Sequence, residues 1–133
     1  MSYPPNYRYT REHEWIRLDN DTAAVGLTDH AQKALGDIVY LDLPRVGDRF
    51  QPMQQLGTVE SVKAVSEIFS PVTCEVVDVN AELSTRPELL NQDPHGGAWL
   101  VKVRVTNPDE MRGLLTAGQY ESYIAEEEVK NEE

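Results

Sequence analysis

Apolar residues in this chain occur in short runs, and each run is ended within a few residues by turn-forming residues. Residues 15–18 (WIRL) end at Asp19, and residues 23–27 end at Thr28. Residues 38–43, rich in β-branched and aromatic side chains, stop at a proline. Runs of this length between turn signals are typical of β-strands. The spacing therefore predicts a mainly β protein, built as a sandwich or small barrel, whose first two strands form a hairpin.

Two later segments alternate apolar and polar residues. Residues 72–79 do so throughout, and residues 99–105 interleave apolar side chains with Lys102 and Arg104. Strict alternation places one face of a strand in the core and the other in water. We therefore expect the first segment to be a third strand of the same sheet system as residues 56–69, and residues 99–105 to be the last strand. Trp15 and Trp99 are interpreted as core anchors.

The stretch from 56 to 69 repeats an apolar residue at every third position, which superficially resembles a helical face. Four of these five residues are β-branched, and Gly57 and Pro71 flank the stretch. This composition favours two strands with a turn between them, placed at Val62-Lys63-Ala64 because alternation fails there. The sequence thus predicts a hairpin over about 56–69.

Helical signals lie at two places. Thr28 precedes a helix-prone run over 29–35 and Gly36 follows it, which predicts a helix of two turns. Beyond Pro108 the chain turns helical over about 109–130, and a helix from Gln119 to about Lys130 would place Tyr120, Tyr123 and Ile124 on one stripe.

Length and charge limit the classes of function. The chain has 133 residues, which predicts a single domain over 1–133. Its 12 Lys and Arg against 23 Asp and Glu give a net charge of −11, which disfavours nucleic acid and suits protein partners with basic patches. It has no apolar run long enough to cross a bilayer and no leader-like start, so we expect no membrane association and a cytoplasmic location.

Thiol and metal chemistry are not expected. Cys74 is the only cysteine and cannot form an internal disulfide, and it has no basic partner nearby in the sequence. His13, His30 and His95 are scattered along the chain without metal-ligand spacing, so no zinc site is predicted. Catalysis by any of the three histidines is not expected either.

Lys63 stands out because a lysine at a tight hairpin tip holds its amine in solvent on a fixed platform, which suits covalent modification. Most lysines at turn tips only increase solubility, so the residues around Lys63 must show whether it is a modification site. The segment 57–66 (GTVESVKAVS) resembles the lipoylation segment of the glycine cleavage system H-protein family. Further segments resemble the same family in its order: HEW (13–15), GLTDHAQ (26–32), SPV (70–72), EVVDVN (75–80), PELLN (87–91) and DP (93–94) followed by GAWL (97–100).

The resemblance runs from about residue 8 to about residue 125 and implies a barrel-sandwich hybrid of the lipoyl/biotinyl type. It implies that Lys63 carries lipoic acid in amide linkage and that the protein is a monomeric carrier, not an enzyme. The implied partners are a pyridoxal-phosphate glycine decarboxylase that loads an aminomethyl group, a tetrahydrofolate-dependent aminomethyltransferase that removes it, and a dihydrolipoyl dehydrogenase that reoxidises the arm. A lipoate ligase or an octanoyl or lipoyl transferase would attach the cofactor.

An aminomethyl group bears a cationic amine and is labile to hydrolysis, so an acidic groove that excludes water would protect it. Glu14, in the matched segment, and Glu67, just after the hairpin, are candidates for such a cradle, and Glu12 is a weaker one. The alternative for each is an ordinary exposed carboxylate on an acidic protein. Glu60 is expected to take part in recognition by the lipoylating enzyme.

Two positions depart from the family pattern. Cys74 stands where glycine is usual, and it would be strained if φ there were positive. His95 stands where an aromatic residue is usual, and its role is not predicted.

Alternative readings are weighed against the same residues. A biotinyl domain usually has methionines on both sides of the lysine, whereas Val62 and Ala64 flank Lys63. A lipoyl domain of a 2-oxoacid dehydrogenase usually has Asp before the lysine. An enzyme would need converging groups, but neighbouring residues at 12–14 would alternate faces on a strand. A protein that relays lipoyl groups to other complexes, and an unlipoylated regulator with the same fold, remain open.

Overall fold

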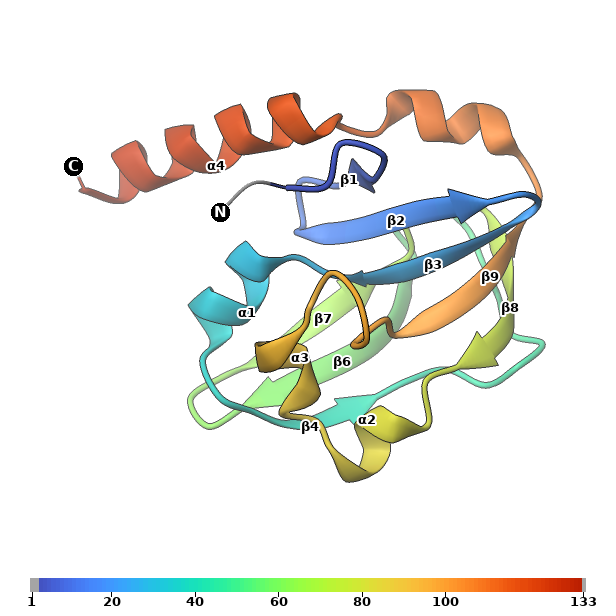
Figure 1. Cartoon of the computed structure of the whole chain (residues 1–133), viewed down its shortest axis with the longest axis horizontal. Helices are drawn as coiled ribbons and strands as arrows, with labels where there is room; N and C mark the ends of the chain where they lie inside the picture. The colour runs from blue at the N-terminus through green and yellow to red at the C-terminus, as the bar shows by residue number, and fades with distance from the viewer. Residues whose placement is uncertain (1–2, 133) are drawn as a thin grey trace.

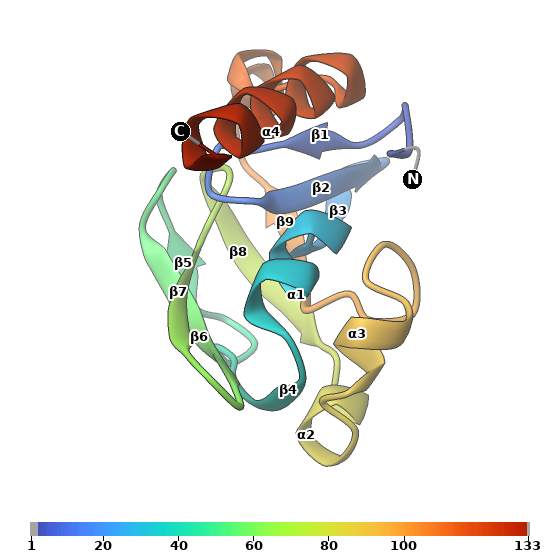
Figure 2. The same cartoon turned by 90° about the vertical axis from the view of Figure 1, so that its left-hand side faces the viewer.

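Two antiparallel β-sheets form the body of the protein, and helices lie at its ends (Figures 1 and 2). The computed structural model describes residues 3–132, with side chains for 3–129. The predicted domain of 1–133 therefore includes residues 1, 2 and 133, which lie outside the described residues. The strands are β1 (Arg8–Tyr9), β2 (Glu14–Asp19), β3 (Thr22–Leu27), β4 (Ile38–Asp42), β5 (Arg49–Phe50), β6 (Gln55–Ser61), β7 (Val65–Phe69), β8 (Cys74–Val79) and β9 (Val101–Val105).

The larger sheet has the strand order β1-β2-β3-β9-β8-β5, and the smaller one has the order β4-β6-β7. The helices are α1 (Asp29–Leu35), α2 (Glu82–Thr85), α3 (Leu89–Gln92), the 3-10 helix η1 (Pro108–Gly113) and α4 (Ala117–Glu132). The mainly β prediction is confirmed, and the two sheets facing each other fit the expected barrel-sandwich arrangement.

The main core lies between the two sheets. Ile16 and Val25 from the larger sheet, and Val59 and Ile68 from the smaller one, are almost completely buried in one apolar cluster. On β6 and β7 the buried side chains are few, because the outer face of the smaller sheet is left to solvent. Burial of one face of each sheet is the dominant favourable contribution to such a fold.

A second cluster, made mainly of aromatic side chains, joins α4 to the outer face of the larger sheet. It contains Tyr3, Tyr7, Tyr9, Trp15, Ala24 and Tyr120. The Tyr9 and Tyr120 rings stack with their centroids 4.8 Å apart. Figure 2 shows α4 running above β1 and β2. The predicted stripe on this helix is confirmed, since Tyr120 is fully buried and Tyr123 and Ile124 pack against the cluster.

Local signals place the first helix and the hairpin. The Thr28 side chain accepts a hydrogen bond from the Ala31 amide at the start of α1, and Gly36 ends the helix with a φ of 82°. The turn between β6 and β7 falls at 62–64, where the loss of alternation predicted it. The predicted first hairpin is likewise confirmed: β2 pairs with β3, with Glu14 opposite Leu27 and Asp19 opposite Thr22.

Several expectations are corrected. Residues 74–79 form β8, but this strand pairs with β9 and β5 in the larger sheet and not with the 56–69 hairpin. Trp99 precedes β9 and is only partly buried, with the Lys102 ammonium 4.7 Å from its ring centroid. Between β8 and β9 the chain forms the short helices α2 and α3, whose helical turns satisfy backbone groups of this connection.

The segment before β2 also differs from expectation. Residues 11–13 form a turn, and His13 has a φ of 71°, so residues 12–14 do not alternate along a strand. Cys74 lies in β8 and is not among the described residues with positive φ, so the conditional strain at this position does not arise.

Gly57 generates a prediction about stability. A Cβ at this position would lie 2.2 Å from the Asp42 carbonyl oxygen, which belongs to the paired strand β4 and cannot rotate away. Gly57→Ala should therefore lower the free energy of unfolding by about 1–3 kcal/mol, the usual cost of overpacking. Urea unfolding measures this. Gly113→Ala is the matched control, because an added Cβ there meets nothing within 4 Å; equal stabilities of the two variants would contradict the prediction.

Candidate functional site

The turn that carries Lys63 is fixed by the side chain of Ser61. The Ser61 hydroxyl oxygen accepts hydrogen bonds from the amides of Lys63, at 3.3 Å, and Ala64, at 3.1 Å. The backbone closes the same turn, since the Ser61 amide donates to the Ala64 carbonyl at 2.8 Å. A fourth bond, from the Val62 amide to the Asp37 carbonyl at 3.0 Å, fastens the turn to the segment after α1. The backbone under Lys63 is therefore held from two sides.

The Lys63 side chain is exposed and leaves the turn near the end of α1. A Cβ added to Gly36 would lie 3.6 Å from the Lys63 Cε. No hydrogen bond or ion pair within the described residues engages the Lys63 amine. An exposed lysine on a backbone this well held presents its amine to another protein at a defined place.

A small pocket of about 140 Å³ lies on the same side, between α1 and the hairpin. Its apolar wall comes from Leu27, Val59 and the α1 residues Ala31, Ala34 and Leu35. Glu12 and Glu67 also line it, from the turn before β2 and from β7. The structure thus brings together two of the three predicted cradle residues, around a pocket with an apolar wall and two carboxylates.

Glu14 does not line this pocket. Its side chain is completely buried, and its carboxylate accepts a hydrogen bond from the Thr10 hydroxyl at 2.5 Å and another from the Phe69 amide at 3.2 Å. Glu14 therefore does not face the pocket, so it is not one of the carboxylates that line it. It is also buried, which rules out the alternative of an ordinary exposed carboxylate. It joins β2, in the larger sheet, to β7, in the smaller one.

Burial raises the pKa of the Glu14 carboxyl to about 7, although the hydrogen bonds from Thr10 and Phe69 act in the opposite direction. The carboxylate form of Glu14 loses its hydration on burial, and the hydrogen bonds from Thr10 and Phe69 compensate for only part of that loss. Sequence reasoning missed this burial because the partner, Phe69, is 55 residues away.

Exposed apolar side chains surround Lys63, which the sequence interpretation did not single out. Val62, Val65 and Tyr40 are 70%, 65% and 57% exposed. Glu60 is also exposed, and it lies in register with Tyr40 on β4 and Val65 on β7. Exposed apolar groups gathered at one place are typical of protein contact surfaces.

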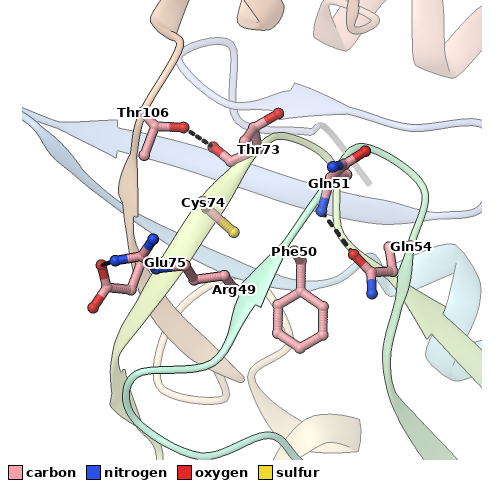
Figure 3. A pocket seen from close by; sticks show the side chains of 8 residues that line it. All are labelled: Arg49, Phe50, Gln51, Gln54, Thr73, Cys74, Glu75 and Thr106. Atoms are coloured by element: carbon pink, nitrogen blue, oxygen red, sulfur yellow. Dashed lines mark hydrogen bonds and ion pairs between the residues drawn. The ribbon is translucent and has the colours of Figure 1, made fainter.

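A larger pocket of about 430 Å³ lies between β5 and β8, and Figure 3 shows its side chains. Cys74 and Phe50 line it. Burial raises the pKa of the Cys74 thiol, which disfavours the nucleophilic thiolate. Lys63 does not line this pocket.

His95 now has a structural role. Its Nε2 accepts a hydrogen bond from the Asp29 amide at 3.0 Å, at the start of α1, and its backbone carbonyl accepts one from the Tyr7 hydroxyl at 2.6 Å. Burial lowers the pKa of His95, which suits a neutral ring that accepts a hydrogen bond.

Among the helices formed by residues 3–132, none combines the length and the apolar character that crossing a bilayer requires.

Comparisons with known proteins agree with this arrangement. A family model described as glycine cleavage H-protein matches residues 7–127. A glycine cleavage system H protein of Koribacter versatilis is 53% identical over 127 residues, covering 96% of this chain and 98% of the relative. One from Acidobacterium capsulatum is 50% identical, with the same coverage. The crystal structure of a glycine cleavage system H protein from Mycobacterium marinum superposes with a TM-score of 0.82 at 33% identity, covering 94% of this chain and 98% of that one.

The pKa of Glu14 predicts a pH dependence of stability. The folded state binds the proton more tightly than the unfolded state, whose carboxyl has the ordinary pKa of 4.5. The stabilisation is thus complete below pH 4.5 and is lost as the pH rises through about 7. Between pH 5 and 8 the unfolding free energy should fall by about 2–3 kcal/mol because of this group.

Glu14→Gln should remove most of that dependence, because glutamine keeps the shape of the protonated acid and can bond to both Thr10 and Phe69. Urea unfolding across this pH range measures the slope. Glu67→Gln, which changes an exposed carboxylate nearby, should keep the slope of the unsubstituted protein. An unchanged slope in Glu14→Gln would show that another group titrates.

Proposed function

Because the chain belongs to the glycine cleavage H-protein family, we propose that Lys63 carries a lipoyl group in amide linkage. The protein is a non-catalytic carrier, and membership of this system implies the enzymes of the system as partners. The observation that carries the attachment site is the exposed Lys63 amine on a turn fixed by Ser61. The residues fit the group, since the Lys63 side chain is exposed and no described residue bonds to its amine.

The lipoyl group, when attached, supplies a disulfide that accepts electrons and a thiolate that holds a one-carbon unit. The chain supplies a rigid platform. The short tether keeps the reactive end at high effective concentration around a docked partner, and the turn held by Ser61 and by the Asp37 carbonyl fixes the point from which the tether starts. Each partner then meets the same local surface around the lysine.

We assign three enzymes as the partners in transfer: a glycine decarboxylase, an aminomethyltransferase and a dihydrolipoyl dehydrogenase. A lipoate ligase or an octanoyl or lipoyl transferase attaches the arm. The exposed side chains of Tyr40, Val62 and Val65, with Glu60 between two of them, support this assignment, because they offer apolar contact area and one charge beside the lysine.

The pocket between α1 and the hairpin is our candidate for the cradle of the loaded arm. Glu12 and Glu67 place negative charge where a cationic amine would be stabilised, and the apolar wall limits access of water. Glu14 acts as a positioning residue, since its bonds to Thr10 and Phe69 hold the two segments from which Glu12 and Glu67 project.

The two alternatives make different demands on the same lysine. A relay protein for other lipoate-dependent complexes would also be lipoylated, whereas a regulator that kept only the fold would not be. The cytoplasmic location and the monomeric state stay predictions from the sequence.

Lys63→Arg tests the attachment site. A lipoate ligase supplied with ATP and lipoic acid should add one lipoyl group to the unsubstituted chain and none to Lys63→Arg, because the guanidinium keeps the charge but cannot form the same amide. Intact-mass spectrometry and peptide mapping measure this. In a reconstituted system, glycine decarboxylation should be lost with Lys63→Arg.

Lys33→Arg is the matched control, because Lys33 is an exposed lysine on α1 that pairs with Asp29 at 3.0 Å. It should be modified like the unsubstituted chain. An adduct that persists on Lys63→Arg would remove Lys63 from the proposal. Absence of any adduct on protein isolated from its host would favour the regulator.

The cradle is tested by the pair Glu12→Gln and Glu67→Gln in the lipoylated, aminomethyl-loaded protein. Loss of two carboxylates beside the cationic amine should speed release of ammonia by about two- to tenfold, as expected for partly exposed charge pairs. Release is followed in the absence of the aminomethyltransferase. Glu88→Gln, a substitution of an exposed residue at the start of α3, is the control. Equal rates of ammonia release in the double variant and in this control would contradict the cradle proposal.

A further inference from the structure

Three side chains capable of binding a metal converge from distant parts of the chain. His13 lies in the turn before β2, His30 in α1 and Glu127 in α4, and one ligand atom of each lies within 4.8 Å of the others. The His13 Nε2 is 3.5 Å from a Glu127 carboxylate oxygen, and the two imidazole rings are 4.7 Å apart between centroids. No metal site was expected because the histidines lie far apart in the sequence, but the fold brings His13 and His30 close together in space.

The His13 ring is held in the orientation that a metal ligand needs. Its Nδ1 lies 2.8 Å from the hydroxyl of Tyr120, which is fully buried, and that hydroxyl lies 2.7 Å from the Thr28 Oγ1. With a proton on Nδ1 donated to Tyr120, the Nε2 lone pair points toward Glu127. A hydrogen bond at the second ring nitrogen is the usual support of a metal-bound histidine, since it fixes both the ring and the tautomer.

We propose that His13, His30 and Glu127 bind a divalent zinc ion. Two imidazoles and one carboxylate form a ligand set that zinc commonly accepts, and water would complete four-coordination. Zinc bonds of about 2.0–2.2 Å require ligand atoms closer together than the widest separation here, so side chains must move inward. His13 and Glu127 have side-chain exposures of 21% and 35%, which leaves room for that movement and for entry of the ion.

The bound ion would add a direct link among three elements that already meet through packing and through the hydrogen bonds of Tyr120. It would join α4 to α1 and to the turn that carries Glu12, one wall of the pocket beside the hairpin. The net charge of −11 raises the local concentration of cations around the molecule. The site does not depend on Lys63 or on its modification.

Zinc chloride titrated into the untagged full-length chain tests the site by isothermal calorimetry. One ion should bind per chain, and the midpoint of thermal unfolding should rise with zinc, because the ion binds the folded state. Glu127→Gln, His30→Gln and His13→Asn should each weaken binding by more than the roughly 10- to 100-fold that loss of an outer partner costs. Asparagine is chosen at position 13 because it tolerates positive φ.

Glu126→Gln is the matched control, since Glu126 is an exposed neighbour outside the cluster; it should bind zinc like the unsubstituted chain. Cobalt in place of zinc should give the intense visible absorption of a tetrahedral site, lost in the three variants. Circular dichroism without metal shows whether each variant is folded, and Glu127→Gln carries the test if a histidine variant is not. No saturable binding, or equal affinity in all variants, would overturn the proposal.

Discussion

The buried Glu14 carboxylate is the interaction on which the arrangement of the two sheets around the site depends. It accepts hydrogen bonds from Thr10, beside the larger sheet, and from Phe69, in the smaller one. A buried polar group of this kind stabilises only an arrangement in which its hydrogen bonds are made. If one partner moves away, the buried oxygen that it bonded is left without a hydrogen bond from either protein or water, which costs free energy. Apolar packing between the sheets is non-directional, whereas these hydrogen bonds have direction and specify how β7 sits against the turn before β2.

This fastening links the carrier's two requirements. The proposed attachment at Lys63 needs a platform that keeps its shape when a partner docks, and Ser61 and the Asp37 carbonyl hold the turn under Lys63 in this way. The pocket beside it is assembled from α1, β6, β7 and the turn before β2, so its shape depends on the sheets keeping their relation. In the proposed carrier, the folded chain thus supplies rigidity and the attached arm supplies mobility.

The sequence allowed the hairpin, the first helix and the C-terminal helix to be predicted, because each has local signals. Thr28 and Gly36 bound α1, and the failure of alternation at 62–64 locates the turn. Sheet membership of β8 could not be obtained this way, since it depends on pairing with β9 across a loop that contains two short helices.

The site shows the same division. Lys63 was identified by the residues around it in the chain, and Glu12 and Glu67 by their position near matched segments. The burial of Glu14, the exposed apolar surface at Tyr40 and the contact between His13 and His30 all arise from residues far apart in the sequence. No pattern within a single segment encodes such contacts.

The backbone bridge between Tyr9 and Leu115 has a consequence for how the protein is made. The backbone amide of each residue donates to the carbonyl of the other, at 2.9 and 2.8 Å. A segment near the start of the chain therefore completes its backbone hydrogen bonds only after a segment near the end has been made. On the ribosome, β1 can pair with β2 early, whereas Leu115, the bridge partner of Tyr9, is translated only after the β6–β7 hairpin. The aromatic cluster can be completed only after Tyr120 has left the exit tunnel, so the outer layer of the larger sheet is the last part of the fold to be completed.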